Sequence, residues 1–256
     1  MRQRLLYLLC LLLPATAAAD VLFSDSSIDL TNYTATPISI DSGVTLEYQN
    51  CSNCGDPGAG FQELVTTPPY VGGSVSFGLI NNDFVYNPAT DGAIGSIGVS
   101  VDQSVSFNRS PGGGFYTVFV PLLEEGGNYY MAVLYGTGFS PGDTTEGYQT
   151  LSESGLMETD FGQVTFSTTT DLINSYNSSI NPDFSSAGAP IQVGFVPVVS
   201  LNDQFSVEAD YVNLSFDIAP ATPVPEPAPV APLALLAGGS VLLVFRRPTQ
   251  AGSRPN

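Results

Sequence analysis

The most distinctive pair of reactive residues is Cys51 and Cys54, which are separated by only two residues. The third cysteine, Cys10, lies in a segment that we expect to be removed during export. In an oxidising compartment a disulfide is the default state of two neighbouring cysteines. A redox-active pair would need a following helix, which the sequence GDPGAG disfavours, and a zinc site would need two further Cys or His ligands. We therefore predict a structural Cys51–Cys54 disulfide, with free thiols as the alternative.

The residue types that most enzymatic mechanisms need are absent. The chain has no His, and all six of its basic residues are Arg, which excludes Ser-His, Cys-His and Ser-Lys nucleophiles and Schiff-base chemistry. Paired carboxylates, as in glycoside hydrolysis, are the one general catalytic option left. Glu124 and Glu125 are adjacent, but they fall in a predicted hairpin turn, and successive strand residues point to opposite faces. We expect both to be solvated and Glu146, Glu153 and Glu158 to stand singly, so the sequence predicts no catalytic residue and no enzyme.

Oxygen-rich loops offer ligands for a calcium ion. One loop contains Asp83, Asn87 and Asp91, and a second contains Asp183. Carboxylate and amide oxygens are the hard donors that calcium takes, but the spacing matches no EF-hand loop. Asp and Asn are also ordinary turn residues. The sequence therefore predicts no metal site and no cofactor, with a structural calcium ion as the alternative.

Aromatic side chains can bind a glycan by stacking on its sugar rings. Trp is absent, but tyrosines gather along a predicted hairpin and the loop after it, namely Tyr116, Tyr129, Tyr130, Tyr135 and Tyr148. Tyr129 and Tyr130 are the candidates for a glycan-binding site. The alternative is that these tyrosines pack in the core or on the sheet surface.

The charge distribution excludes nucleic acid and anionic membrane surfaces as partners. Of the 24 acidic residues only Glu226 lies outside residues 20–223, and Arg109 is the only basic residue in that segment. Phosphate groups are bound by clustered Lys and Arg side chains. The acidic composition therefore indicates solubility and mutual repulsion, with cation binding or a saline habitat as alternatives.

The elements that would position these residues are β-strands. Residues 93–107 and 205–218 alternate apolar with small or polar side chains, which is the pattern of a half-buried strand in an antiparallel sheet. The alternation slips once, at Val212-Asn213, which predicts a bulge there. Further strands are predicted at residues 44–50, 73–87, 115–123, 128–136, 163–168 and 191–200.

Turns rich in Gly, Pro, Asn and Asp separate these strands. Residues 115–123 and 128–136 are joined by EEGGN and are expected to form a hairpin. Only residues 154–162 and 170–177 are candidates to begin a helix, and both helices would be short. Eight or more strands at this spacing predict an all-β fold, a two-sheet antiparallel β-sandwich of the jelly-roll type.

Both ends of the chain carry segments that serve export rather than folding. Arg2 and Arg4 precede an apolar run, and the small residues up to Ala19 predict signal-peptide cleavage before Asp20. Residues 228–245 are free of charge and close to the length needed to span a membrane. The arginines after this run place the C-terminus in the cytoplasm by the positive-inside rule.

The C-terminal tail resembles the PEP-CTERM sorting signal of exopolysaccharide-producing bacteria. The resemblance rests on an apolar run flanked by two motifs, Val224, Pro225, Glu226 and Pro227 before it and Arg246 and Arg247 after it. It implies that exosortase, a membrane protease, processes the tail, in addition to the signal peptidase that the N-terminal segment predicts. The segments FVYNPATDGAIGSIGVSVD, GNYYMAVL and LSESGLMETDF resemble an uncharacterised exported domain that precedes such tails, which implies a concanavalin-like or galactose-binding-like sandwich.

Together these features predict one exported domain with processing signals at both ends. The expected parts are a signal peptide (1–19), a β-sandwich domain (20–219), a Pro-rich linker with the sorting motif (220–227), a transmembrane helix (228–245) and a basic cytoplasmic tail (246–256). The precursor would cross the inner membrane once with a periplasmic domain, and the protein would then reach the cell surface or extracellular matrix. The predicted function is a non-catalytic structural or adhesive role linked to exopolysaccharide. A carbohydrate-binding module and a carboxylate-pair glycoside hydrolase are the alternatives.

Overall fold

The computed structural model describes residues 20–55, 58–68, 72–109, 114–132, 137–139, 147–168, 175–202 and 205–221. These residues belong to one compact unit, Met1–Thr222. The predicted signal peptide, sorting motif, transmembrane helix and basic tail lie outside the described residues, as do Tyr135 and Glu146. Within the described ranges, none of the helices combines the length and the apolar character that crossing a membrane requires.

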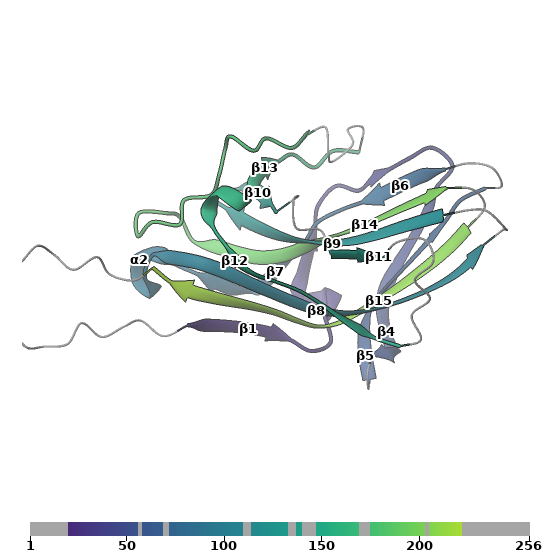
Figure 1. The fold of residues 1–256 in the computed structure, drawn as a ribbon, viewed down its shortest axis with the longest axis horizontal. Helices are drawn as coiled ribbons and strands as arrows, with labels where there is room; N and C mark the ends of the chain where they lie inside the picture. Colours follow the sequence, from purple (N-terminus) through teal and green to yellow (C-terminus); the bar gives the residue numbers. More distant parts are fainter. Residues whose placement is uncertain are drawn as a thin grey trace, which may run out of the picture. The chain divides into compact units, whose positions relative to one another are not determined.

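Six of the described strands form one antiparallel sheet, here called sheet A (Figure 1). They are β1 (Val21–Asp25), β4 (Thr45–Gly55), β5 (Gly58–Thr66), β8 (Ile94–Arg109), β12 (Gln149–Leu156) and β15 (Phe205–Pro220). Their order across the sheet is β12-β8-β15-β5-β4, and β1 pairs with the second half of β15.

The second antiparallel sheet, sheet B, contains nine described strands. They are β2 (Tyr33–Ala35), β3 (Ser39–Ile40), β6 (Gly73–Ser76), β7 (Leu79–Tyr86), β9 (Gly114–Glu125), β10 (Asn128–Met131), β11 (Thr137–Phe139), β13 (Gly162–Val164) and β14 (Ile191–Asn202). Their order is β13-β10-β9-β14-β6-β3, with β11 beside β9 and with β7 pairing to β14 and β2. The described helices are single turns, η2 (Leu30–Asn32), α2 (Pro88–Asp91) and η4 (Glu158–Asp160).

The predicted all-β, two-sheet antiparallel sandwich is confirmed, and so is the bulge in its last strand. The pairing of β15 with β8 shifts register between Val212 and Ser215. Asn213 takes a positive φ of 55° there, and its N–H donates to the Ser26 carbonyl at 3.2 Å. The shift lets Tyr211 and Leu214 both face the core, so one long strand keeps an apolar inner face on each side of the bulge.

The predicted hairpin is also present. Glu125 of β9 pairs with Asn128 of β10, and the pairing continues as far as Leu122 and Met131. Its turn requires glycine, since Gly126 and Gly127 have φ values of 58° and 85°. The second strand ends at Met131, and residues 133–136 of the predicted strand lie outside the described residues.

Sequence reasoning missed several strands, of which β5 and β12 matter most for the site. In β5 the inward positions are Phe61, Glu63 and Val65, so a charged residue interrupts the apolar alternation. Residues 154–162, a candidate helix, instead hold the end of β12 and the single turn η4. A positive φ of 74° at Gly155 accompanies an irregularity in β12 between Glu153 and Leu156.

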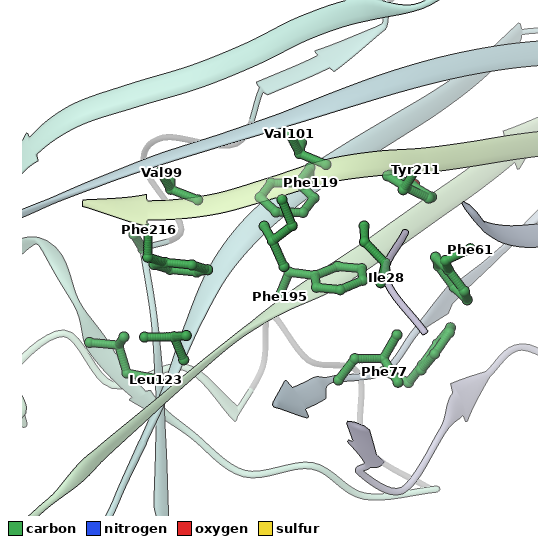
Figure 2. Close-up of a cluster of buried hydrophobic side chains, with 14 of the residues drawn as sticks. Ile28, Phe61, Phe77, Val99, Val101, Phe119, Leu123, Phe195, Tyr211 and Phe216 are labelled. Carbon is green, nitrogen blue, oxygen red and sulfur yellow. The ribbon is translucent and has the colours of Figure 1, made fainter. Parts of the chain in front are cut away.

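The main core lies between the two sheets. Rings from both sheets meet there, with centroid distances of 5.8 Å between Phe61 and Phe195, 5.2 Å between Phe119 and Phe195, and 5.5 Å between Phe61 and Tyr211 (Figure 2). A second apolar cluster, which includes Val120, uses the opposite face of sheet B. Sheet B is therefore apolar on both faces. The outer face of sheet A carries polar side chains instead.

Candidate functional site

The four candidate calcium ligands are placed mainly as local caps. Asn87 Oδ1 accepts from the Ala89 N–H at 3.1 Å, and Asp91 Oδ2 accepts from the Asn87 N–H at 2.9 Å, so both close the single turn α2. Hydrogen bonds from Ser185 hold the pKa of Asp183 below its usual value. Asp83 is exposed on β7. No group of three or more acidic, Cys or His residues with the geometry of a metal site occurs among the described residues.

Cys51 and Cys54 are free thiols in the structure, where the sequence predicts a disulfide. Both lie on β4, whose register with β5 is irregular between Cys51 and Gly55. In this bulge the Cys54 S–H donates to the Cys51 carbonyl oxygen at 3.6 Å, and the two sulfurs are not joined. Burial, together with the nearby Cys51 and Asp210, raises the pKa of Cys54 to about 12. That shift opposes any chemistry that needs a thiolate at this position.

The two tyrosines proposed from the sequence for glycan stacking are not exposed platforms. Tyr130 is only 6% exposed and packs in the main core, which corrects the prediction for this residue. Tyr129 is partly buried, and its ring lies 5.3 Å from that of Phe166 in an edge-to-face contact. Of the other tyrosines, Tyr116 is 46% exposed on β9, and Tyr148 is half-buried before β12.

The adjacent carboxylates at the end of β9 have separate structural roles. Glu125 is buried rather than solvated as predicted, and its two oxygens accept from the N–H groups of Asp183 (2.9 Å) and Ala189 (3.1 Å). Burial raises the pKa of Glu125, and these two hydrogen bonds oppose the rise. Glu124 accepts from the Gly127 N–H at 2.6 Å on the other side of the strand. Glu125 thus ties the segment before β14 to the hairpin.

Glu153 and Glu158, the two other described glutamates considered as catalytic candidates, do not pair with each other. Glu153 lies on β12, and Glu158 opens the turn η4, where its Oε2 accepts from the Phe184 N–H at 3.4 Å. Glu125 and Glu158 therefore lie close to each other around the backbone of Asp183 and Phe184, and Glu158 adds to the raised pKa of Glu125. Glu124 and Glu153 have separate positions, in the hairpin turn and on β12.

A different set of polar residues is brought together on the outer face of sheet A. We call it the polar face and define it by the outward residues of the central rows, Glu47, Gln49, Gln62, Asp102, Ser104, Thr150, Glu208 and Asp210. On β5, β15 and β8 these outward positions alternate with buried ones, so the inner face of the same strands forms the core.

A row of hydrogen bonds crosses the polar face from strand to strand. Gln49 on β4 donates its Nε2–H to Gln62 Oε1 at 3.0 Å, and Gln62 on β5 donates its Nε2–H to Asp210 Oδ1 on β15 at 3.0 Å. The register places Ser104 of β8 next to Asp210 in the same row. The two hydrogen bonds therefore join three neighbouring strands through side chains that lie directly opposite one another, and Ser104 extends the row to a fourth strand by register alone.

A second carboxylate on the polar face is fixed in the same way. Asp102 on β8 accepts from the Thr150 hydroxyl at 2.5 Å and from Asn213 Nδ2 at 2.8 Å. Burial raises the pKa of Asp210, the hydrogen bond from Gln62 opposes the rise, and the neighbouring Glu208 adds to it. Asp210 is thus partly desolvated, and both carboxylates are held in place by amide or hydroxyl donors.

The residues that define the polar face include no aromatic side chain. Tyr48 of β4 lies between two of its rows in sequence, but its ring packs 5.1 Å from that of Phe77. Apart from the partly buried Leu64, which lies between Glu47 and Glu208 in one row, the face offers hydrogen-bonding groups. These are amides that donate and accept, carboxylates that accept, and hydroxyls that do both. This arrangement can recognise a ligand rich in hydroxyl groups.

Part of the polar face could be inferred from the sequence. Glu208 and Asp210 alternate with the apolar residues of β15, so their outward direction follows from the strand pattern. The contribution of Gln62 could not be found in the same way because β5 was not recognised as a strand.

No protein-family model matches the sequence, and no curated protein matches it. Among solved structures, the chain is similar to a family 11 carbohydrate-binding module from Clostridium thermocellum, in complex with a β-1,3-1,4-mixed-linked tetrasaccharide. That match has 11% identity and a TM-score of 0.40, and it covers 82% of this chain and 100% of that chain.

Two further similar structures are also carbohydrate-binding modules. One is the C-terminal family 22 module of Clostridium thermocellum Xyn10B, with 12% identity and a TM-score of 0.34, covering 78% of this chain and 96% of that chain. The other is the CBM22-1 xylan-binding domain of Paenibacillus barcinonensis Xyn10C, with 9% identity and a TM-score of 0.34, covering 81% of this chain and 100% of that chain. The similarity is one of fold class, an all-β antiparallel sandwich of two sheets.

Proposed function

We propose that this domain is a non-catalytic glycan-binding module whose polar face binds an uncharged polysaccharide. The observation that carries the proposal is the Gln49–Gln62–Asp210 row, held by two hydrogen bonds of 3.0 Å across three strands. Side chains that are already fixed by their neighbours lose little conformational entropy when a ligand binds. The row is therefore suited to sugar hydroxyls, which both donate and accept hydrogen bonds.

The charge of the polar face selects the class of glycan. Glu47, Asp102, Glu208 and Asp210 are acidic, and the residues that define the face include no Lys or Arg. A face of one sign of charge repels ligands of the same sign. Polymers rich in uronic acid or sulfate are therefore disfavoured relative to neutral polysaccharides.

The lack of a stacking ring on the polar face favours an extended ligand. A single hydrogen bond contributes only about 0.5–1.5 kcal/mol net, so several must form together to give measurable affinity. An oligosaccharide that lies along several rows can make them, whereas a monosaccharide cannot. We expect affinity to rise with chain length.

A binding role also fits the state of the carboxylates better than hydrolysis does. Asp210 accepts from Gln62, and Asp102 accepts from Thr150 and Asn213, so both side chains have fixed partners within the sheet. Glycoside hydrolysis needs one carboxylic acid and one carboxylate placed on either side of a glycosidic bond. A reducing-sugar assay on each glycan that binds separates the two functions.

A glycan array probed with the secreted domain, residues 20–222, tests the proposal. Gln62→Ala and Asp210→Ala should each weaken binding about tenfold, which corresponds to the loss of about 1.4 kcal/mol. Gln163→Ala is a matched control, because it removes a similar 3.0 Å cross-strand bond, from Gln163 to Asn128, on sheet B. The absence of binding to any neutral glycan would refute the proposal, as would an equal loss in the control.

We also propose that this module is delivered to the cell surface or extracellular matrix by its C-terminal tail. The support is the resemblance of residues 224–227 and 246–247 to the PEP-CTERM signal. In a host that encodes exosortase, mass spectrometry of the native protein should find chains that end near the Pro-Glu-Pro segment. Intact peptides from residues 228–256 as the main species would mean that the tail is only an anchor.

A further inference from the structure

Four polar side chains lie entirely within the core, and each comes from a different strand. Glu63 on β5, Thr117 on β9, Gln103 on β8 and Tyr211 on β15 are all 0% exposed. Among the described residues, the carboxyl oxygens of Glu63 and the Thr117 hydroxyl have no hydrogen-bond partner, and Gln103 and the Tyr211 hydroxyl have none apart from each other. Buried polar atoms in folded proteins nearly always have a partner, so this group needs a physical explanation.

Three of the four side chains lie together on the inner face of sheet A. Tyr211 pairs directly with Gln103, and Ala209, two residues before Tyr211, pairs directly with Glu63. Residues two apart on a strand share a face and are neighbours across the sheet. Burial raises the pKa of Tyr211, and the influence of Glu63 and Gln103 on the same pKa shows that both lie close to its hydroxyl.

The fourth side chain reaches the group from the facing sheet. Thr117 lies between two inward-facing rings of β9 that both touch sheet A. Phe115 is 4.8 Å from Phe107 of β8, and Phe119 is 6.4 Å from Tyr211 of β15. Figure 2 shows Phe119 and Tyr211 among the buried rings. The Thr117 hydroxyl therefore enters the same layer of the core, opposite the three polar side chains of sheet A.

The mixture of donors and acceptors decides what this group can bind. Gln103 Nε2 only donates and Gln103 Oε1 only accepts, whereas the two hydroxyls and a protonated carboxyl do both. A metal ion would leave the Gln103 N–H groups without a partner, and an apolar guest would leave every polar atom without one. Water both donates and accepts, and buried waters typically bridge such groups with about three hydrogen bonds.

We propose that Glu63, Gln103, Thr117 and Tyr211 form an internal water-binding site in the core of the sandwich. The surrounding residues of these strands, such as Phe61, Phe119 and Ala209, provide no counter-charge, and Tyr211 is the one other titratable side chain in the group. A buried carboxylate without a counter-charge is strongly disfavoured. Glu63 is therefore protonated, and its O–H donates a hydrogen bond to the water.

The site gives the two sheets a polar connection inside a core that is otherwise apolar. Three of its side chains belong to sheet A and one to sheet B, so a bridging water joins sheets that pack through side chains. Hydrogen bonds are directional, whereas apolar contacts are not. The water site therefore helps to fix how the two sheets align.

An experimental structure of the secreted domain that resolves ordered solvent tests the site directly. We expect at least one water molecule within about 2.7–3.2 Å of two or more of the four side chains. In solution, the Gln103 side-chain amide protons should show magnetisation transfer from a long-lived water. Direct contacts among the four side chains that exclude water would overturn the proposal, and so would a metal ion in the site.

Two substitutions keep the proposal testable if one variant does not fold. Thr117→Val keeps the shape of the side chain and removes its hydroxyl, so it should lose the water or weaken its binding and lower the Tm. Glu63→Gln keeps the shape and the hydrogen-bonding capacity, so it should retain the water and serves as the matched control. A Thr117→Val protein with the same bound water and an unchanged Tm would refute the role of the hydroxyl, and a Glu63→Gln structure without water would refute the site.

Discussion

Replacing Glu63 with Gln should stabilise the domain at neutral and alkaline pH, because it removes a carboxyl group that is buried without a counter-charge. Glu63 is 0% exposed, and burial raises its pKa from 4.5 to about 8. The folded protein therefore keeps a proton on this group over a pH range in which the unfolded chain has released it. Glutamine has nearly the same shape and no ionisable group.

The sign and the size of the effect follow from proton linkage. Where the folded state binds more protons than the unfolded state, the free energy of unfolding falls as the pH rises. For Glu63 this loss begins near pH 4.5 and is complete above about pH 8. At about 1.4 kcal/mol for each pKa unit, the complete loss of unfolding free energy is about 5 kcal/mol. About 3 kcal/mol of it is reached by about pH 7.

Urea denaturation, followed by circular dichroism from about pH 5 to about pH 9, measures the effect. The difference in unfolding free energy between Glu63→Gln and the wild type should grow by several kcal/mol across this range. Other carboxyl groups contribute equally to both proteins and cancel in the difference. Glu47→Gln makes the same chemical change at an exposed position of β4 and controls for the substitution itself. Parallel curves for Glu63→Gln and the wild type would refute the reasoning.

The remaining predictions concern three other features of the domain. Glu125→Ala leaves the N–H groups of Asp183 and Ala189 without their acceptor and should lower the free energy of unfolding by about 2–4 kcal/mol; a similar loss in the matched variant Glu124→Ala would contradict this anchoring role. Iodoacetamide should modify Cys54 much more slowly in the native protein than in urea at about pH 8, since a pKa of about 12 leaves roughly one thiol in ten thousand ionised. If the native protein instead contains the Cys51–Cys54 disulfide, the denatured and unreduced chain should show no free thiol. Excess chelator should leave the Tm unchanged, because Asn87, Asp91 and Asp183 are engaged as local caps; a lower Tm would point to a stabilising bound metal.

The parts of the fold that the sequence could predict are those in which neighbouring residues determine the outcome. The alternation in β15 gave its inner face and the slip at Val212-Asn213, and the glycines of EEGGN marked the β9–β10 turn. The edge strands β1, β2 and β3 are short, so each shows too few alternations to be distinguished from a loop.

The candidate site could not be predicted in the same way, because it depends on strand pairing between distant parts of the chain. Gln62 and Asp210 are 148 residues apart, and only the order β8-β15-β5-β4 brings them into one row. One of the two tyrosine candidates, Tyr130, is ruled out for the opposite reason. Tyr130 is near its neighbours in sequence, but the pairing of β10 with β9 and β13 turns it into the core.

Glu63 and its three polar neighbours show how one kind of signal can have two opposite meanings. A polar residue at an inward position of a strand weakens the alternation of apolar and polar residues. For this reason Glu63 kept β5 from being predicted as a strand. In the folded sandwich the same kind of exception recurs at Gln103, Thr117 and Tyr211, on three other strands, and register makes three of the four side chains neighbours on the inner face of sheet A. A single polar exception argues against a strand, whereas several that pair in register indicate a polar site enclosed by strands. Register, which the sequence does not display, is the information that separates these two cases.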